Sequence, residues 1–586
     1  MVTRGKIDPI TFELIKNSLA SLIDEMALTM NRTAYSPLVR DLFDFATGLC
    51  DKEGNILAEG LVNPIHSGVF PLFIKTIPEV WGERIYPGDI LMCNDPYEGA
   101  SHIPDVYTVR PIFIDGELVA YTGAIAHQLD FGGRTAGSNA CDNIEIYQEG
   151  LRIPPLKYYE RGERNYTLYR LIQKNVRSSH LVIGDLEAQV AATGIGERKF
   201  VELVEKYGGW KNFHRYLDEL LDYSERLARA TIRELPDGVY EFDDYMDDDG
   251  FTANPIKFHV KVVVEGDEIT FDFTGTSAKS KGSINLPLSS TYATVHSAMR
   301  CLLDTSVPAN SGVYRPIRII APYGTMVNVG FPAGVAGRGA TIGRLFDAIQ
   351  GALAKVAPDK IPACSSNIDF GICLGGTDEE GNPVVFTDFL AGSWGARPWA
   401  DGIDANTPFW LNYSNITCER IERDYPLRIE QYGFVPETGG AGKYRGGMAM
   451  VRDYRILAED IVCQWRQDRA KFPPWSLQGG KSGTLAKGYH ISDGKERTLR
   501  KELFFCQKGD LLRAVLPGAA GYGNPYQRDV NKVLEDVRNE IITVETAKRE
   551  YGVVIDPKNM QVDSKATQKL RAEAKLRENK KSSAGV

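Results

Sequence analysis

Two of the eight histidines in this chain stand close to an aspartate in one short stretch. His102 and Asp105 belong to the segment Ser101-His102-Ile103-Pro104-Asp105, and His127 follows further along. Two imidazoles and one carboxylate form a ligand set that can bind a catalytic divalent metal ion and leave positions open for water or substrate. The three side chains can do this only if the local structure brings them together.

A β-hairpin is the element that would bring them together. Runs of alternating apolar residues flank Asp115-Gly116, a dipeptide typical of two-residue hairpin turns. If this turn sets the register, the numbers of facing residues add up to 231, so that Pro104 faces His127 and Asp105 faces Ala126. The candidate ligands then meet at the open end of the hairpin, because opposed and diagonal neighbours lie within roughly 5–8 Å of each other.

Each candidate ligand also has a structural interpretation. His102 can cap a turn, Asp105 can bond neighbouring backbone amides in an Asx-turn, and His127 can be an ordinary histidine at the end of a strand. The spacing His-x-x-Asp alone does not separate these interpretations from a metal site.

Three further polar residues stand next to apolar runs, namely Arg40, Asp41 and His66. Arg40 and Asp41 can form a structural ion pair, and His66 can cap a helix or turn. The sequence favours neither these structural roles nor a catalytic role for the three residues.

The composition is typical of a soluble globular protein with several domains. Of the 586 residues, 43% are hydrophobic and 25% are charged, which allows large cores. A chain of this length exceeds one ordinary core, so roughly two to four domains are expected. No apolar run is long enough to span a membrane, and the N-terminus leads into an amphipathic segment instead of a signal sequence. We therefore expect a cytoplasmic protein that binds no membrane.

Charge and motif content argue against several functional classes. The net charge of −9 gives no basic footprint for nucleic acid. The nine cysteines include no C-x-x-C pair, which suits a reducing compartment and disfavours a disulfide framework or a zinc ribbon. None of the glycine-rich stretches matches a P-loop or a dinucleotide-binding motif. We therefore expect no nucleotide site in this chain.

Apolar periodicity predicts a multi-domain α+β protein with mainly antiparallel sheets and packed helices. A helix begins after Asp8 with Pro9 in its first turn, and residues 184–207 and 214–235 have helical spacing. Alternating runs typical of strands dominate after Pro236. We expect five regions: an N-terminal α+β domain with the metal site (1–160), a helical region (161–236), a second α+β domain (237–357), a glycine-rich β domain (358–530) and a C-terminal helix with a charged tail (531–586).

Several local features of the later regions carry predictions. The aspartates between 243 and 249 lack the spacing of an EF-hand loop and are interpreted as a solvated loop. The glycine pairs of the fourth region are expected to form tight turns where backbones pack closely. Residues 533–552 are predicted to form one helix. The charged tail, 564–586, is either helical against a partner or disordered.

Motifs in a fixed order occur along the chain from about Ile7 to Ile555. They are Arg40-Asp41, Gly88-Asp89, Asn94-Asp95-Pro96-Tyr97, Ser101 to Val106, Glu149 to Pro155, Gly184-Asp185-Leu186, Asp272 to Ser277, Ala336-Gly337-Arg338, Gly439 to Gly447 and Pro517 to Pro525. With these motifs the chain resembles the hydantoinase B family. That family includes one half of ATP-dependent hydantoinases, 5-oxoprolinases and caprolactamase, and related subunits of acetone and acetophenone carboxylases.

The resemblance implies a division of labour between two subunits. A partner of the hydantoinase A type, with an actin-like ATPase fold, binds ATP and magnesium and phosphorylates a carbonyl oxygen. The B-type subunit then acts at a metal site, which the resemblance places on His102, Asp105 and His127 with one divalent ion, zinc or manganese. Asp41 falls beside this site and is expected to activate water or a substrate proton. The expected complex is a heterotetramer with two copies of each subunit.

The activity that the resemblance implies is ATP-dependent hydrolysis of a cyclic amide, of the hydantoinase, lactamase or oxoprolinase type. Phosphorylation makes the poorly electrophilic carbonyl open to attack by water, whose pKa falls from 15.7 towards roughly 7 on zinc. The alternative is a subunit of an ATP-dependent ketone carboxylase, which would need the same metal site. A scaffold without chemistry is disfavoured because all three ligands are present.

Overall fold

The computed structural model describes residues 7–60, 63–366, 370–378 and 380–583, with side chains up to residue 576. The protein has a mixed α+β fold with several mainly antiparallel sheets, which confirms the predicted fold class. Among the described strands, only β10 and β11 pair in parallel. None of the described helices is both long and apolar enough to cross a membrane. The predictions for residues 1–6 and for the last three residues of the tail fall outside the described part of the chain.

The first sheet carries the candidate ligands. Its seven strands have the order β2-β1-β5-β4-β3-β6-β7, and helices cover both of its faces. The strands are β1 (Phe45–Asp51), β2 (Ile56–Glu59), β3 (Ile90–Cys93), β4 (Asp105–Ile114), β5 (Glu117–His127), β6 (Leu156–Glu160) and β7 (Glu163–Arg164).

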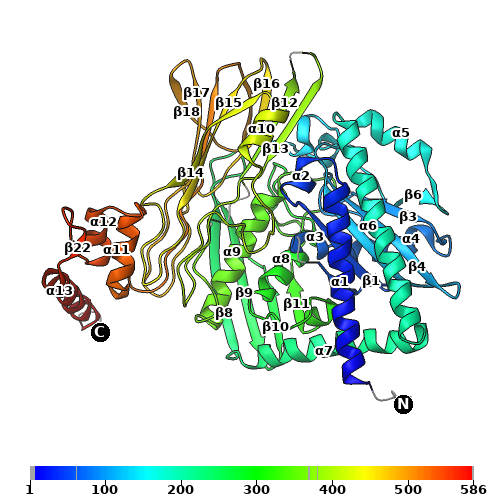
Figure 1. Cartoon of the computed structure of the whole chain (residues 1–586), viewed down its shortest axis with the longest axis horizontal. Helices are drawn as coiled ribbons and strands as arrows, with labels where there is room; N and C mark the ends of the chain where they lie inside the picture. The colour runs from blue at the N-terminus through cyan, green and yellow to red at the C-terminus, as the bar shows by residue number, and fades with distance from the viewer. Residues whose placement is uncertain (1–6, 61–62, 367–369, 379, 584–586) are drawn as a thin grey trace.

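One face of this sheet is covered by two long helices that lie side by side (Figure 1). Helix α1 (Pro9–Thr33) begins as predicted, because the Asp8 side chain accepts a hydrogen bond from the Thr11 amide at 2.8 Å. Its apolar residues pack with those of α6 in one buried cluster. The helical spacing of residues 184–207 and 214–235 is confirmed by α6 (Ser179–Lys206) and α7 (Trp210–Arg233); α5 (Tyr166–Asn175) precedes them, and α4 (Phe70–Trp81) covers the opposite face.

The β4–β5 hairpin has the predicted turn. Asp115 and Gly116 both have positive φ, 51° and 83°, as a type I′ turn requires. Next to the turn the register is the predicted one, since Ile114 pairs with Glu117. The local signal of the dipeptide therefore sets the first pairs of the hairpin correctly.

Further from the turn the predicted register is wrong, because β5 contains a β-bulge. Val119 has no partner across the strands, and the numbers of facing residues add up to 232 beyond it. Asp105 therefore faces His127, not Ala126. The difference matters because facing residues lie on the same side of a sheet, whereas a one-residue slip would turn these two side chains to opposite sides.

The core of the first sheet continues into the third region. A four-stranded sheet of order β11-β10-β9-β8 packs with α8 and α9, and its apolar residues join those of α4 in one buried cluster. The predicted regional boundaries remain a prediction. The elements are β8 (Gly238–Met246), β9 (Ile256–Glu265), β10 (Glu268–Asp272), β11 (Ile317–Ile320), α8 (Leu288–Arg300) and α9 (Arg338–Val356).

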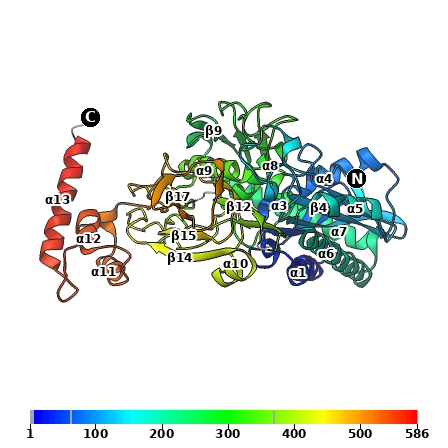
Figure 2. The same ribbon diagram turned by 90° about the horizontal axis from the view of Figure 1, so that it is seen from above.

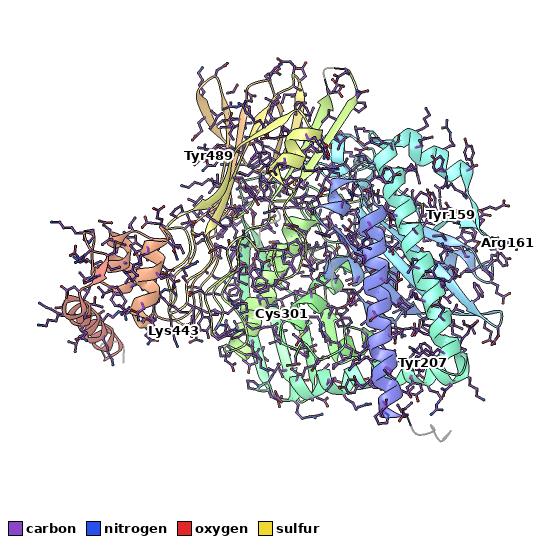
Figure 3. All side chains as sticks on the ribbon, viewed as in Figure 1. Tyr159, Arg161, Tyr207, Cys301, Lys443 and Tyr489 are labelled. Carbon is purple, nitrogen blue, oxygen red and sulfur yellow. The ribbon has the colours of Figure 1, made fainter. Side chains whose placement is uncertain are left out.

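Two further sheets share a core in the fourth region, at the top of Figure 1. Their orders are β13-β12-β16-β19 and β14-β15-β20-β17-β18. Figure 3 marks Tyr489 on β17 of the second sheet. The elements are β12 (Gly371–Thr377), β13 (Pro383–Asp388), α10 (Cys418–Asp424), β14 (Leu427–Val435), β15 (Ala449–Ile456), β16 (Ile461–Arg466), β17 (Lys487–Ser492), β18 (Lys495–Thr498), β19 (Glu502–Cys506) and β20 (Leu511–Val515).

Most of the aspartates interpreted as a solvated loop are buried, so that interpretation is wrong. Asp247 is 3% exposed and accepts hydrogen bonds from the backbone amides of Ala470 and Lys471. Arg344 binds both Asp244 and Asp468. The charges are compensated by a distant segment that follows β16, which the local sequence pattern could not show.

Removing Asp468 should strongly destabilise the protein. Asp468→Ala leaves Arg344 and Lys501 buried without this carboxylate, a loss that typically costs about 3–5 kcal/mol. Arg226→Ala, which breaks an exposed ion pair with Glu219, should cost less than about 1 kcal/mol. Urea denaturation followed by fluorescence measures both. Equal midpoints for the two variants would contradict the importance of the buried network.

The glycine-rich segments pack closely, as predicted, but most of them are not tight turns. The extended stretches around Gly440, Lys481 and Gly521 are joined by backbone hydrogen bonds and run towards the C-terminal helices in Figure 1, and Figure 3 marks Lys443 on the first of them. A Cβ on Gly440 would lie 2.2 Å from the Lys481 carbonyl oxygen, and one on Gly483 would lie 1.8 Å from that of Gly518. Glycine is therefore required for the close approach of backbones, not for turn geometry.

The C-terminal region forms a separate cluster of helices at one end of the molecule, as Figure 2 shows from above. The single helix predicted for 533–552 is wrong. The chain forms α11 (Val530–Arg538) and α12 (Val544–Tyr551), because Glu540 has a positive φ of 58° and Thr543 caps the second helix. The charged tail is helical: α13 spans Ser564–Ser583, after the short strands β21 (Ile555–Asp556) and β22 (Gln561–Val562).

Candidate metal centre

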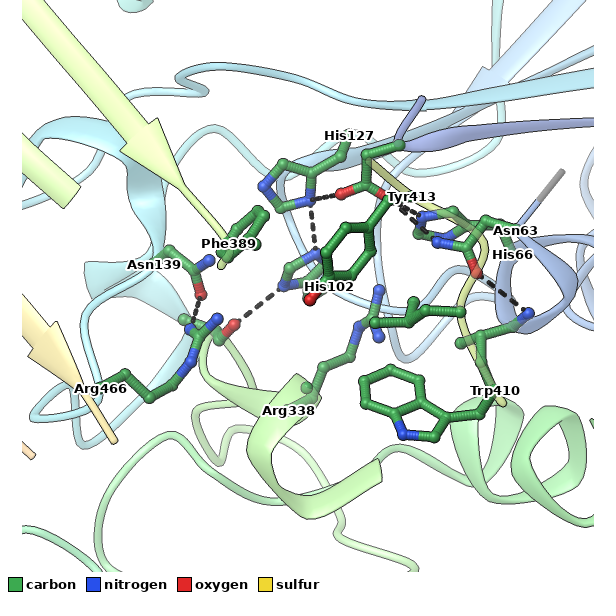
Figure 4. A pocket seen from close by; sticks show the side chains of 15 residues that line it. Asn63, His66, His102, His127, Asn139, Arg338, Phe389, Trp410, Tyr413 and Arg466 are labelled. Carbon is green, nitrogen blue, oxygen red and sulfur yellow. Dashed lines mark hydrogen bonds and ion pairs between the residues drawn. The ribbon is translucent and has the colours of Figure 1, made fainter. Parts of the chain in front are cut away.

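The three predicted ligands meet at the open end of the hairpin, and Figure 4 shows two of them, His102 and His127, side by side. Asp105 begins β4, His127 ends β5, and His102 lies in the loop before β4. The Oδ1 atom of Asp105 lies 3.0 Å from His102 Nε2 and 2.9 Å from His127 Nδ1, and the two nitrogens are 3.2 Å apart. Donors of one tetrahedral zinc ion, each about 2.0–2.2 Å from the metal, have nearly this separation, about 3.4 Å.

The protonation of His102 favours a cation between these donors. Its Nδ1 lies 2.9 Å from the Ala336 carbonyl oxygen, which can only accept, so Nδ1 carries the proton. Burial and the neighbouring Arg338 guanidinium lower the pKa of His102 to about 3, so the ring is neutral at ordinary pH. The lone pair of Nε2 then faces a carboxylate oxygen, an arrangement that a bound metal ion stabilises. The residues present therefore fit a divalent ion.

Arg338 and Ser101 hold the second oxygen of Asp105. The Arg338 guanidinium, at the start of α9, forms an ion pair with Oδ2, and the Ser101 hydroxyl donates a hydrogen bond to the same atom. Burial opposes the charged form, but Arg338, His102 and His66 together outweigh it and keep the pKa of Asp105 well below its usual value. Asp105 is thus an oriented, ionised carboxylate.

A second pair of side chains, Asp44 and His66, lines the same cavity. His66 Nε2 lies 2.8 Å from Asp44 Oδ1, which also accepts a hydrogen bond from Asn63 Nδ2 at 2.9 Å. The other ring nitrogen of His66 is 3.4 Å from Asp105, and Asp44 Oδ2 is 4.0 Å from His127. Burial disfavours the imidazolium, but Asp105 and Asp44 together raise the pKa of His66 to about 9.

Asp41 does not lie among the residues that line the cavity. It ends the short helix α2 (Pro37–Arg40), and its carboxylate lies 3.7 Å from Arg420 of α10. Asp44, three residues further on, stands immediately before β1 and occupies the position beside His127. The catalytic role expected for Asp41 remains a prediction that no contact with the cluster supports.

Sequence reasoning missed Asp44 and Arg338 and left His66 open. His66 lies in the short helix α3 (Pro64–Ser67). The interpretation as a capping residue therefore predicted its position in the chain fold correctly but did not predict where its side chain lies. A sequence signal existed for Asp44, which directly precedes a strand. That signal becomes informative only once β1 is known to pair with β5, a contact between distant segments.

The cavity has a polar wall and an apolar wall. Its space of about 400 Å³ is partly open to solvent. The polar wall is formed by Asp44, His66, His102, His127 and Arg338, together with Asn63, Asn139 and Arg466. The apolar wall consists of side chains from the segments that follow β13, namely Phe389, Trp410, Leu411 and Tyr413, together with Ile65.

A second group of metal-binding side chain types occurs in the fourth region. His490, Cys506 and Asp510 bring their donor atoms within 4.8 Å of one another. Asp510 already accepts from His490 and from the Gln507 amide, at 2.7 and 2.9 Å. Structural zinc sites use four protein ligands, and none of these three residues lines the cavity beside His102. The His102 group is therefore the candidate site.

The fold and the site define a mixed α+β protein with a buried His-His-Asp cluster at one end of a seven-stranded sheet. A family model described as "Hydantoinase B/oxoprolinase" matches residues 8–525. The chain therefore belongs to the hydantoinase B/oxoprolinase family, and the predicted resemblance is confirmed.

Two relatives align with this chain over nearly their whole length. It is 36% identical to the putative B-type subunit of a D-/L-hydantoinase from Pseudomonas sp. (strain NS671), with 97% of this chain and 98% of that protein aligned. The crystal structure of the ATP-dependent caprolactamase from Pseudomonas jessenii matches with a TM-score of 0.90 at 30% identity, over 97% of this chain and 100% of that one. An acetone carboxylase structure, at 19% identity, has the same fold with a TM-score of 0.90, over 98% of this chain and 84% of that one.

Proposed function

We propose that this chain is the B-type subunit of an ATP-dependent cyclic amide hydrolase. The observation that supports the proposal most is the convergence of His102 Nε2, His127 Nδ1 and Asp105 Oδ1 on one point, where the two histidines line a partly open cavity. Likeness over nearly the whole chain to one half of a hydantoinase and to a caprolactamase favours a cyclic amide as substrate. The acetone carboxylase match supports the fold only, so ketone carboxylation is the less favoured function.

The three ligands would hold one divalent ion, zinc or manganese. When bound, such an ion supplies Lewis acidity that polarises an oxygen of its ligand. The chain's own residues fix the donors: Ala336 sets the proton of His102, and Arg338 with Ser101 orients Asp105. The Nε–H group of Arg338 is buried and has no hydrogen-bond partner among the described residues.

Asp44 is positioned to accept a proton from water. One of its oxygens is held by His66 and Asn63, and the other is directed towards His127 in the cavity. The water oxygen forms a bond to the carbon of the phosphorylated ring, and its proton passes to Asp44. The ring C–N bond then breaks as the nitrogen takes a proton, and the resulting acyl phosphate loses phosphate to a second water molecule. Asp44 thus takes over the role that the sequence suggested for Asp41.

The partner in this scheme is a hydantoinase A-type ATPase, in a complex with two copies of each subunit. Two relatives support a partner, since the names of the Pseudomonas hydantoinase chain and of the caprolactamase beta chain both describe one of several subunits. ATP and magnesium would be bound by that partner. None of the nine cysteines, all of which lie in the described part of the chain, forms a disulfide, which supports a location in a reducing compartment such as the cytoplasm.

Expressed alone, this chain should hydrolyse no ATP, whatever cyclic amide is supplied. Together with the A-type subunit it should release phosphate in proportion to a hydantoin or lactam added. The measurement is a phosphate-release assay on the single chain and on the co-purified complex, with acetone plus bicarbonate as the competing substrate set. Phosphate release that requires bicarbonate and a ketone would favour a carboxylase. Amide-dependent ATP hydrolysis by the chain alone would contradict the division of labour.

A further inference from the structure

Glu149 is a buried carboxylate behind the metal centre that the proposed reaction does not use. Its side chain is 0% exposed, and it does not line the cavity. Its Oε1 accepts hydrogen bonds from two consecutive backbone amides, those of Val335 at 2.6 Å and Ala336 at 2.9 Å. The carboxyl group therefore fixes one short segment of the backbone immediately before α9.

The segment that Glu149 fixes contacts two of the three candidate ligands. The Ala336 carbonyl accepts the Nδ1–H group of His102 at 2.9 Å. Two residues later, Arg338 forms the ion pair with Oδ2 of Asp105. A displacement of this segment would move both contacts together, because the residue whose amide donates to Glu149 also supplies the carbonyl that orients His102.

The backbone around Glu149 leaves little room for an alternative arrangement. A Cβ on Gly334 would lie 2.8 Å from Glu149 Oε1, so glycine is needed where the segment passes the carboxyl group. Gly150, the next residue, has a φ of 149°, and a Cβ there would lie 2.5 Å from the Phe131 carbonyl oxygen. The contact between Glu149 and the Val335 and Ala336 amides is thus part of a closely packed junction of three segments.

We propose that Glu149 is a positioning residue of the metal centre. By holding the Val335 and Ala336 amides, it keeps the Ala336 carbonyl on His102 and the Arg338 guanidinium on Asp105. The inference rests on the proposed metal binding by His102, Asp105 and His127. Glutamine offers the same acceptor oxygen at this position, whereas alanine offers none, so the effect depends on the acceptor and not on a negative charge.

The test compares Glu149→Ala with Glu149→Gln in the full-length chain. Affinity for zinc is measured by competition with a chelator, and the visible spectrum of the cobalt-substituted protein reports the ligand geometry. We expect Glu149→Ala to bind zinc about tenfold more weakly, the lower end of the effect of lost outer partners, with a changed cobalt spectrum. Glu149→Gln should bind within about twofold of the unchanged protein, with its spectrum preserved.

Asp185→Ala is the matched control. Asp185 is also 0% exposed and accepts hydrogen bonds from two consecutive amides, those of Tyr35 and Ser36 at 2.7 and 3.0 Å, but that segment carries no candidate ligand. It should lower the melting temperature without changing zinc affinity or the cobalt spectrum. Unchanged affinity in Glu149→Ala, or equal losses in the Ala and Gln variants, would overturn the role of Glu149. If the unchanged protein binds no metal, the proposed function itself fails.

Discussion

The His127→Ala variant should lose its bound metal and, with it, all product formation. Two protein ligands remain, and a divalent ion should be held at least about a hundredfold more weakly, since losing even an outer partner of a ligand costs 10–100-fold. The hairpin should persist, because the substitution lies at its open end and the Asp115-Gly116 turn is unchanged. Elemental analysis of the purified complex and an assay of ring-opened product measure the two effects.

His214→Ala is the control for this experiment. His214 lies on the exposed side of α7, with half of its side chain accessible, and pairs with Asp218 instead of the cluster. It should retain metal and turnover. If His127→Ala also retains stoichiometric metal and full turnover, the three residues have the structural roles considered at first and not a metal-binding one.

The Asp44→Asn variant should retain its metal but lose turnover by a factor of about 10²–10⁴, the usual contribution of a positioned general base. Asparagine preserves the size of the side chain but cannot accept a proton from water. The measurement is kcat and KM of the complex alongside metal content. KM should change little, because Asp44 is expected to act in the chemical step and not in substrate binding.

Asp41→Asn is the informative comparison for Asp44→Asn. Asp41 lies outside the cavity and faces Arg420, so we expect its substitution to leave turnover nearly unchanged. The opposite pattern, with turnover lost in Asp41→Asn and kept in Asp44→Asn, would restore the role inferred from the sequence for Asp41. It would also show that Asp44 does not accept the proton.

The parts of the fold that local signals determine were predictable from the sequence. The first helix follows from Asp8 and Pro9, which cap it and occupy its first turn. The hairpin turn follows from Asp115-Gly116, whose positive φ values suit few other residue pairs. The three candidate ligands were found because all of them belong to this one hairpin and the loop before it.

The rest of the site depends on contacts between distant parts of the chain. Asp44, His66 and Arg338 come from the residue before β1, from α3 and from α9, and only the assembled sheet and core bring them to His102. The buried aspartates illustrate the same limit. Asp247 appears solvated in its own neighbourhood of charged residues, yet the amides that satisfy it lie more than 200 positions away.

Val119 gives strand β5 one residue more than its partner strand needs. Leu118 and Ala120 face the neighbouring residues Phe113 and Ile112, so Val119 stands outside the ladder. Deleting Val119 alone would therefore leave Asp105 facing His127. If Val119 instead paired regularly, every side chain beyond it would slip by one position and turn to the other side of the sheet, and His127 would point towards the helices α1 and α6. The ligand set thus depends on keeping one residue out of the pairing, and a change in that pairing would remove a ligand without altering any ligand residue.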